Sequence, residues 1–233
     1  MAALMVYAGA VAGDARVTRI GGIPLVPAGF TWPACRACAG PMQFLAQVML
    51  GDLGAGSWQG FLSVFMCGGD PGMCEEWDAA AGGNRALVFA GGSLAPAAVP
   101  AGPAAMLGEV SAVQYVAVDA DYDDARRAWA GREGRPVSEV LGQLGGRPSW
   151  VQADETPACP GCGQLMCFVV QLEEGHDRRT AVNFGGGAAD TGSPAGRAGR
   201  RPFSGSGYLA SCPPVRAPDV QCGTYAVRWL RQW

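Results

Sequence analysis

The sequence predicts an α+β protein that is predominantly β and is built as an internal duplication of two similar β-rich repeats. Residues 20–47 and 144–171 align without a gap at a spacing of 124, and ten of the 28 aligned positions are identical. The chain of 233 residues holds 36 glycines and 17 prolines between short apolar runs, which suits strands joined by turns. Each repeat also carries a Cys-x-x-Cys pair followed by two further cysteines.

The first repeat, residues 1–120, is expected to consist mainly of strands. Its apolar start resembles a signal peptide, but the first positive residue is Arg16, so a buried first strand is the favoured interpretation. The following apolar runs have the length and composition of strands and are bounded by glycine and proline. Strands are expected at 15–20, 42–50, 61–67, 85–90 and 113–118.

A helical connection over 121–143 is expected to join the repeats. Asp121 or Asp123 can cap a first helix that runs to Arg132, and Ser138 can cap a second helix that ends at the glycines after residue 144. The second repeat then occupies 144–233, and the two repeats are expected to pack as one body. Its strands are expected at 167–172, 180–184, 208–212 and 224–230, with a flexible Gly-, Ala-, Ser- and Arg-rich insertion at 185–207.

The charge and hydropathy of the chain argue against binding to nucleic acid or membranes. The net charge is −3 and the sequence pI about 5.2, so no global positive field attracts nucleic acid or an anionic membrane. No window reaches the ~18 consecutive apolar residues of a membrane span. A cytoplasmic protein is expected, and nine cysteines in a reducing compartment favour metal ligation over disulfides.

Eight of the nine cysteines fall into two sets with knuckle-type spacing. A Cys-x-x-Cys turn presents two thiolates on one side, and two such ends together form a tetrahedral four-sulfur site suited to Zn²⁺. We therefore expect two structural zinc ions, with disulfides, inert thiols and an iron–sulfur cluster as open alternatives. Whether the ligands pair within or across the repeats stays open. The sets are Cys35, Cys38, Cys67 and Cys74, and Cys159, Cys162, Cys212 and Cys222.

The first knuckle differs from the second at the position after its second cysteine. Gly163 supplies a residue that tolerates positive φ there, whereas the first knuckle has Ala39. All-cysteine sites leave no open coordination position, so such zinc holds structure and performs no chemistry. His176 is the sole histidine and no hydrolase or nucleotide-binding motif is present, so no catalytic residue is assigned.

The first repeat contains IGGxP, a proline-rich run, PxCxxCxxxMxFLAQ and a strand ending in cysteine, and the second contains LGGRPSWVQ, PACPGCGQLMCFVVQ and GYLASC. This combination resembles the programmed cell death protein 2 family and the bacterial YwqG-like proteins. The likeness covers residues 16–230. It implies a duplicated, β-rich α+β fold that binds zinc, and a chaperone or adaptor role toward a protein partner. The composition, without lysine, is typical of a GC-rich bacterial genome.

Three functional hypotheses follow. The first is a non-enzymatic, zinc-stabilised protein that binds a protein or peptide between its repeats, where Trp32 and Trp150 are candidate contact residues or else core residues. The second is an RNA- or ribosome-associated zinc-knuckle factor that uses Arg197, Arg200 and Arg201. The third is an enzyme whose reaction the sequence does not identify.

Overall fold

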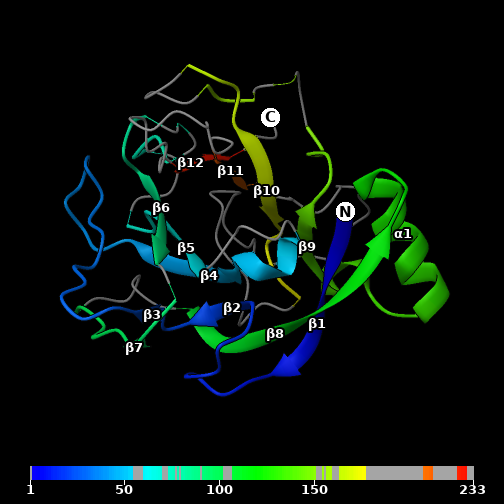
Figure 1. Ribbon diagram of the computed structural model, residues 1–233, viewed down its shortest axis with the longest axis horizontal. Coiled ribbons are helices and arrows are strands. Elements are labelled where there is room, and N and C mark those ends of the chain that lie inside the picture. Colours follow the sequence, from blue (N-terminus) through cyan, green and yellow to red (C-terminus); the bar gives the residue numbers. More distant parts are fainter. Residues whose placement is uncertain are drawn as a thin grey trace, which may run out of the picture.

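A computed structural model describes most of the chain through residue 176 and two later strands. The described residues are 2–54, 60–69, 73–76, 78, 80–89, 91–101, 107–150, 154, 156–158 and 163–176, with the backbone alone at 107, 207–211 and 225–229. This part is mostly β and contains one α-helix, so the predicted β-rich α+β class is confirmed (Figure 1). None of the described helices is long and apolar enough to cross a membrane.

Ten strands form one antiparallel sheet, and two short strands form a second sheet. The large sheet has the order β12-β11-β10-β9-β1-β8-β2-β4-β5-β6, and the small one pairs β3 with β7. The sheet is strongly curled, so that its edge strands β6 and β12 approach within 8 Å between Cα atoms (Figure 1). The strands are β1 Ala2–Ala10, β2 Arg19–Gly22, β3 Leu25–Val26, β4 Gln43–Met49, β5 Phe61–Met66, β6 Asn84–Phe89, β7 Ala95–Pro96, β8 Leu107–Val118, β9 Val140–Gly145, β10 Cys167–Leu172, β11 Gly207–Ser211 and β12 Tyr225–Trp229.

The order of the large sheet is arranged about its central pair, β1 and β8. We call β2, β4, β5 and β6 the first half-sheet and β9, β10, β11 and β12 the second half-sheet. Each central strand pairs with the half-sheet from the other part of the chain: β1 pairs with β9 of the second half-sheet, and β8 pairs with β2 of the first. We call this the crossed-over pairing. In these pairs Leu4 lies opposite Gln143, and Ala112 lies opposite Arg19.

Several local contacts recur at the 124-residue spacing of the sequence repeat. The amide of Leu25 donates to Gln47 Oε1 at 3.1 Å, and the amide of Ser149 donates to Gln171 Oε1 at 3.2 Å. The amide of Met42 donates to the Pro33 carbonyl, and that of Met166 to the Pro157 carbonyl, both at 2.9 Å. The chain nevertheless forms one continuous sheet rather than two separate repeat bodies, so the internal duplication stays a prediction.

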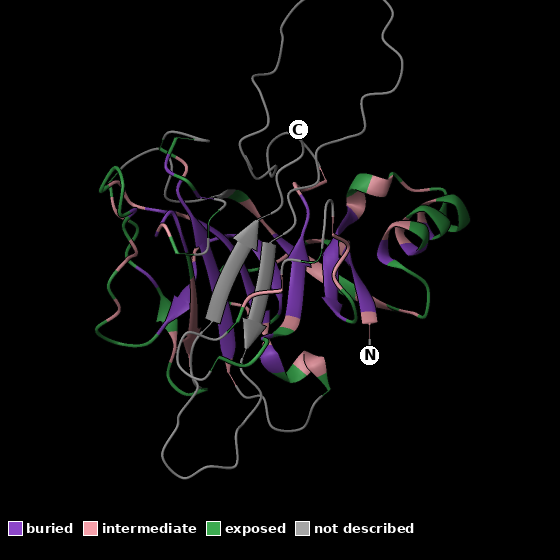
Figure 2. Ribbon diagram, turned by 90° about the horizontal axis from the view of Figure 1, so that it is seen from above, coloured by how far each residue is buried: buried purple, intermediate pink, exposed green. Residues whose placement is uncertain are grey.

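The core lies on both faces of the central strands. Met5 of β1 joins the main cluster, which holds buried aliphatic side chains of β2, β4, β5, β9 and β10. Leu4 and Val6 point to the opposite face, as alternation along a strand requires, and pack beneath the helix α1, Tyr122–Glu133. Figure 2 shows buried residues in the strands of the sheet and the exposed outer side of α1; of the central pair, β1 is largely buried and β8 is mostly half-buried or exposed. A first strand buried on both faces explains the apolar start of the sequence.

The helical connection is shorter than the sequence predicts. The helix α1 is confirmed, but the second helix expected at 138–144 is wrong, because a 3-10 turn at Val137–Glu139 leads directly into β9. Pairing with β1 and β10 buries every residue of β9. Gly142 has φ +145°, and a Cβ there would lie 2.0 Å from the Gln171 carbonyl oxygen, so this glycine permits close strand contact.

The remaining predicted segments differ in how well they agree with the observed strands. The strand expected at 15–20 begins only at Arg19, and the strand expected at 113–118 extends back to residue 107. The late strands expected at 208–212 and 224–230 correspond to β11 and β12. The strand expected at 180–184 and the insertion at 185–207 lie outside the described residues.

Candidate metal centre

The first cysteine pair sits on a tight turn between two short extended segments. Ala34 and Pro41 form a β-bridge across the turn. The Cys35 amide donates to the Gly40 carbonyl, and the Ala39 amide donates to the Cys35 carbonyl, each at 2.9 Å. Ala39 adopts φ +59°, a conformation that normally favours glycine. The turn therefore forms with an alanine at the position where Gly163 of the second knuckle has φ +72°.

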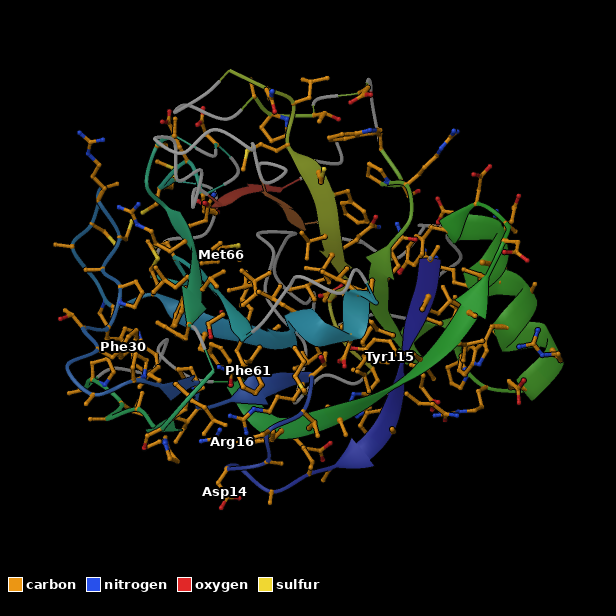
Figure 3. The ribbon with its side chains drawn as sticks, viewed as in Figure 1. Asp14, Arg16, Phe30, Phe61, Met66 and Tyr115 are labelled. Atoms are coloured by element: carbon orange, nitrogen blue, oxygen red, sulfur yellow. The ribbon has the colours of Figure 1, made fainter. Side chains whose placement is uncertain are left out.

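The second cysteine pair comes from the end of β5 and the segment that follows it. The Cys67 amide donates to the Gly83 carbonyl at 2.7 Å, which fixes Cys67 beside the start of β6. Figure 3 labels Met66, the residue before Cys67, and Phe30 of the surrounding aromatic residues. Antiparallel pairing of β4 with β5 brings this strand end next to the knuckle, which directly precedes β4. This local strand pair therefore brings the knuckle beside Cys67, and Cys74 from the segment after β5 completes the first set.

The four sulfurs have the spacing of a tetrahedral metal site. The Sγ atoms of Cys35, Cys38, Cys67 and Cys74 all lie within 4.8 Å of one another. Cys38 Sγ is 3.6 Å from Cys67 Sγ, which is too long for a disulfide but close to the ~3.8 Å edge expected for Zn–S bonds of about 2.3 Å. The described cysteines are free thiols. This cluster could hold one zinc ion.

Apolar side chains surround three of the four cysteines. Cys35, Cys67 and Cys74 are buried, while Cys38 is exposed. Phe44, Phe65 and Met42 share their core cluster, and Phe30, Trp32 and Leu87 pack against it. The rings of Phe44 and Phe65 lie 5.4 Å apart, centroid to centroid. A shell of this kind limits water access to the three buried cysteines and supports a structural site.

Burial opposes ionisation of the thiols in the absence of a cation. Desolvation raises the pKa of the Cys74 thiol, as it does for Cys67. Desolvation also pushes the pKa of Cys35 upward, but backbone amides of the knuckle, those of Cys38 and Ala37, lower it overall. Thiolate ligands must lose their protons, so a bound metal supplies the positive charge that this cluster otherwise lacks. The donor set therefore fits Zn²⁺.

The cysteines of the second set, Cys159, Cys162, Cys212 and Cys222, lie outside the described residues. The described edges of the second knuckle match those of the first: Ala158 and Leu165 form a β-bridge at the positions of Ala34 and Pro41. The ninth cysteine, Cys167, belongs to neither set and is exposed on β10.

The two candidate partner-binding tryptophans have different surroundings. Trp32 is half-buried beside the cysteine cluster, where its Nε1 donates to the Met42 carbonyl at 2.8 Å and its ring lies edge-on to Phe65 at 5.7 Å. Trp150 is half-buried and follows Ser149, which lines a surface pocket near α1. Partner contact by either residue stays a prediction.

Sequence reasoning missed two buried polar groups. Arg19 is fully buried, and Glu173 is 7% exposed beneath α1, where it accepts a hydrogen bond from Tyr122 Oη at 2.8 Å and pairs with Arg126 at 3.2 Å. The available signal was the identity of Gln47 and Gln171 in the two repeats. Gln47 accepts a 3.4 Å hydrogen bond from Arg19, and Gln171 donates one of 3.4 Å to Glu173.

A short segment of the chain is similar to a known protein. No protein-family model and no solved structure matches the chain. A segment of 33 residues is 52% identical to the uncharacterized protein YpfL of Salmonella typhimurium. This segment covers 14% of this chain and 8% of YpfL. The match is too short to assign a family.

Proposed function

We propose that this protein is a non-enzymatic, zinc-stabilised binding protein that acts as a chaperone or adaptor toward a protein partner. The observation that carries the proposal is the closed four-sulfur cluster, with all ligand atoms within 4.8 Å of one another. Four cysteine ligands leave no coordination position for a substrate, which supports a structural role for the metal. Cys35, Cys38, Cys67 and Cys74 would hold the ion and thereby tie the knuckle to β5.

We further propose that the chain is an internal duplication and that the second set, Cys159, Cys162, Cys212 and Cys222, holds a second zinc ion. Three kinds of observation support this: the half-sheets have the same strand order about β1 and β8, the Gln47 and Gln171 contacts correspond, and the two knuckle bridges correspond. Cys212 follows β11 just as Cys67 follows β5, and each strand pairs with the strand after its knuckle.

Metal counting tests both parts of the metal proposal. Native mass spectrometry should show two additions of about 65 Da each to the bare polypeptide, one per structural zinc. Cys67→Ser and Cys162→Ser should each leave one ion, and the double variant none. Cys167→Ser, which removes the exposed unmatched cysteine, is the matched control and should keep both. A wild-type protein without metal overturns the proposal, and one ion that Cys162→Ser does not affect limits it to the first set.

Crosslinking followed by affinity purification from the native cells tests the binding role. A protein partner should be recovered in similar amount with and without RNase and in both low and high salt. Recovery of RNA that disappears at high salt would instead favour the nucleic-acid hypothesis, because phosphate contacts are strongly salt-dependent. Turnover of a small molecule by the purified, metal-loaded protein would overturn the non-enzymatic assignment.

A further inference from the structure

A surface pocket opens beside the amino end of α1. Its volume is about 610 Å³, and it lies where the start of β1, the end of β8, the first turn of α1 and the segment after β9 meet. Four aspartates line it, together with Tyr122, Gln143 and the 146–149 segment. The aspartates are Asp119, Asp121, Asp123 and Asp124.

The strand registers identify the place in the first half-sheet that corresponds to this pocket. Arg19 lies opposite Ala112, and Gln143 lies opposite Leu4. The pair Arg19–Ala112 therefore matches the pair Gln143–Leu4. A residue of β9 corresponds to the residue of β2 that is 124 positions earlier, and a residue of β8 corresponds to the residue of β1 that is 108 positions earlier. Because β1 ends at Ala10 and β8 at Val118, the 108 spacing holds to the strand ends.

In the first half-sheet, the side chain of Arg19 fills the corresponding place. Its guanidinium donates to the carbonyl oxygen of Gly13 and, at 2.7 Å, to that of Ile23. Gln47 Oε1 accepts a further bond at 3.4 Å. Burial lowers the pKa of Arg19, and the Asp14 carboxylate, in the loop between β1 and β2, partly opposes this effect (Figure 3). A planar cation is thus held between two carbonyl groups.

In the second half-sheet, the shorter Gln143 occupies the position of Arg19. Its amide donates to the Arg147 carbonyl at 2.5 Å, and Arg147 corresponds to Ile23 at the 124 spacing. Gly13 corresponds to Asp121 at the 108 spacing, and Asp121 lines the pocket. Within the described structure Gln143 donates to the Arg147 carbonyl but makes no hydrogen bond to Asp121. The pocket lies on the Asp121 side of Gln143.

The acidic groups of the pocket are not all engaged. Asp123 pairs with Arg126 at 3.2 Å and accepts from Ser149 Oγ at 2.9 Å, while Asp124 pairs with Arg127 at 2.7 Å. Asp119 and Asp121 are exposed and make no hydrogen bond or ion pair with any other described side chain. The exposed Arg147 adds one positive side chain to the rim, which leaves the lining acidic.

We propose that this pocket binds a guanidinium group, in the position that corresponds to the Arg19 guanidinium of the first half-sheet. Asp119 and Asp121 supply the counter-charge, and the pocket has room for the stem that carries the group. A guanidinium is preferred over an ammonium because its planar fork can bridge two acceptors at once. The group can come from a small molecule or from an arginine side chain of a protein. The inference rests on residues separate from the cysteine cluster.

Isothermal titration calorimetry with the metal-loaded protein and Nα-acetylarginine amide tests the proposal. The compound should bind saturably, and the lysine and citrulline analogues should bind at least about tenfold more weakly. A Gly-Arg-Gly peptide distinguishes the two sources: tighter binding than the amide indicates an arginine within a protein, and weaker binding indicates a small molecule. Equal binding of the lysine analogue, or no saturable binding of the arginine compounds, overturns the proposal.

Two variants locate the site. Gln143→Arg should fill the pocket as Arg19 fills its counterpart and should reduce binding at least about tenfold while the protein stays folded. Asp119→Asn/Asp121→Asn changes exposed positions and should reduce binding to a similar extent, so it decides the matter if the first variant does not fold. Glu133→Gln, at the opposite end of α1, removes one negative charge as the matched control and should change binding less than twofold. Undiminished binding by the double variant overturns the assignment of the site.

Discussion

The two half-sheets share one strand order but differ in what lies beside the central pair. The connection from β1 to β2 is a loop over residues 11–18, whereas the connection from β8 to β9 includes α1. Leu4 and Val6 on β1 are buried beneath α1, and at the 108 spacing they correspond to Ala112 and the exposed Gln114 on β8. The helix therefore covers the large apolar side chains of β1, and Val116 and Val118 at the end of β8 pack against the same cluster. The same backbone frame supports a filled interior at Arg19 and an open pocket at Gln143.

The largest expected effect comes from separating the two halves of the chain. A cut after residue 106 leaves β1 without β8 and β9, and β8 without β2. We expect neither 1–106 nor 107–233 to fold alone, and we expect the two fragments to reassemble one to one when mixed. NMR amide dispersion and analytical ultracentrifugation measure this. A cooperatively folded 1–106 fragment would contradict the crossed-over pairing.

Removing a ligand from the first cysteine set should destabilise the protein strongly. Cys67→Ser should lower the free energy of unfolding by about 3 kcal/mol or more, since structural zinc contributes on the order of 10 kcal/mol in small domains. Thermal unfolding with and without a chelator measures the loss. Cys167→Ser, at the exposed cysteine of β10, should melt like wild type. Equal melting temperatures for the two variants would argue against a metal at this site.

Replacing Arg19 by the glutamine found at the matching position 143 should lower the free energy of unfolding by an intermediate amount. Arg19→Gln should destabilise by about 1–3 kcal/mol, because the Gly13 carbonyl loses a charged hydrogen-bond donor and a cavity remains. Gln at this position can still reach the Ile23 carbonyl, as Gln143 reaches that of Arg147. Urea unfolding measures the change. Stability equal to wild type would show that the buried guanidinium contributes nothing net.

The acid beneath α1 should make stability depend on pH. Burial raises the pKa of Glu173 to about 7, although Arg126 and the Tyr122 hydroxyl oppose the shift. The folded state then holds a proton that the unfolded chain loses above its ordinary pKa of 4.5, so stability falls as pH rises from 4.5 to 7. Glu173→Gln should remove this slope, on the order of 1–3 kcal/mol over the window. An unchanged slope in urea unfolding across pH 5–7.5 would exclude Glu173 as its source.

The smallest expected effect lies in the knuckle turn. Ala39 has φ +59° where Gly163 of the other knuckle has φ +72°. Ala39→Gly should stabilise the protein by up to about 1 kcal/mol, because glycine adopts this conformation without Cβ strain. Ala37→Gly, two residues earlier in the same turn, lacks positive φ and should not stabilise. Melting temperatures compare the pair, and a loss of stability with Ala39→Gly would refute the strain argument.

Local patterns predicted what local interactions decide. The apolar first strand, the helix beginning near Asp121 and the first cysteine cluster all follow from nearby residues or from an antiparallel strand pair. The pairing of β1 with β9 could not be predicted, because it joins positions more than 130 residues apart. The same pairing makes Val140–Gly145 a strand despite a pattern that suits a helix.

The pocket was equally inaccessible to sequence reasoning. The difference between Arg19 and Gln143 has meaning only once both are known to occupy matching places opposite the central strands. The run of aspartates at 119–124 suggests no more than a strand end and a helix cap. The aspartates line a pocket only because the 146–149 segment, which follows β9, lies beside them.

The position of β1 in the sheet also has a consequence for protein synthesis. This strand is synthesised before both of its neighbours in the sheet, which begin at residues 107 and 140. Leu4, Met5 and Val6, buried in the finished fold, therefore remain without a strand partner while roughly half of the chain is translated. An unpaired apolar strand favours aggregation, so β1 is exposed to this risk until β8 and β9 have been synthesised. Slowing translation before residue 107 should lengthen this exposed interval and increase aggregation.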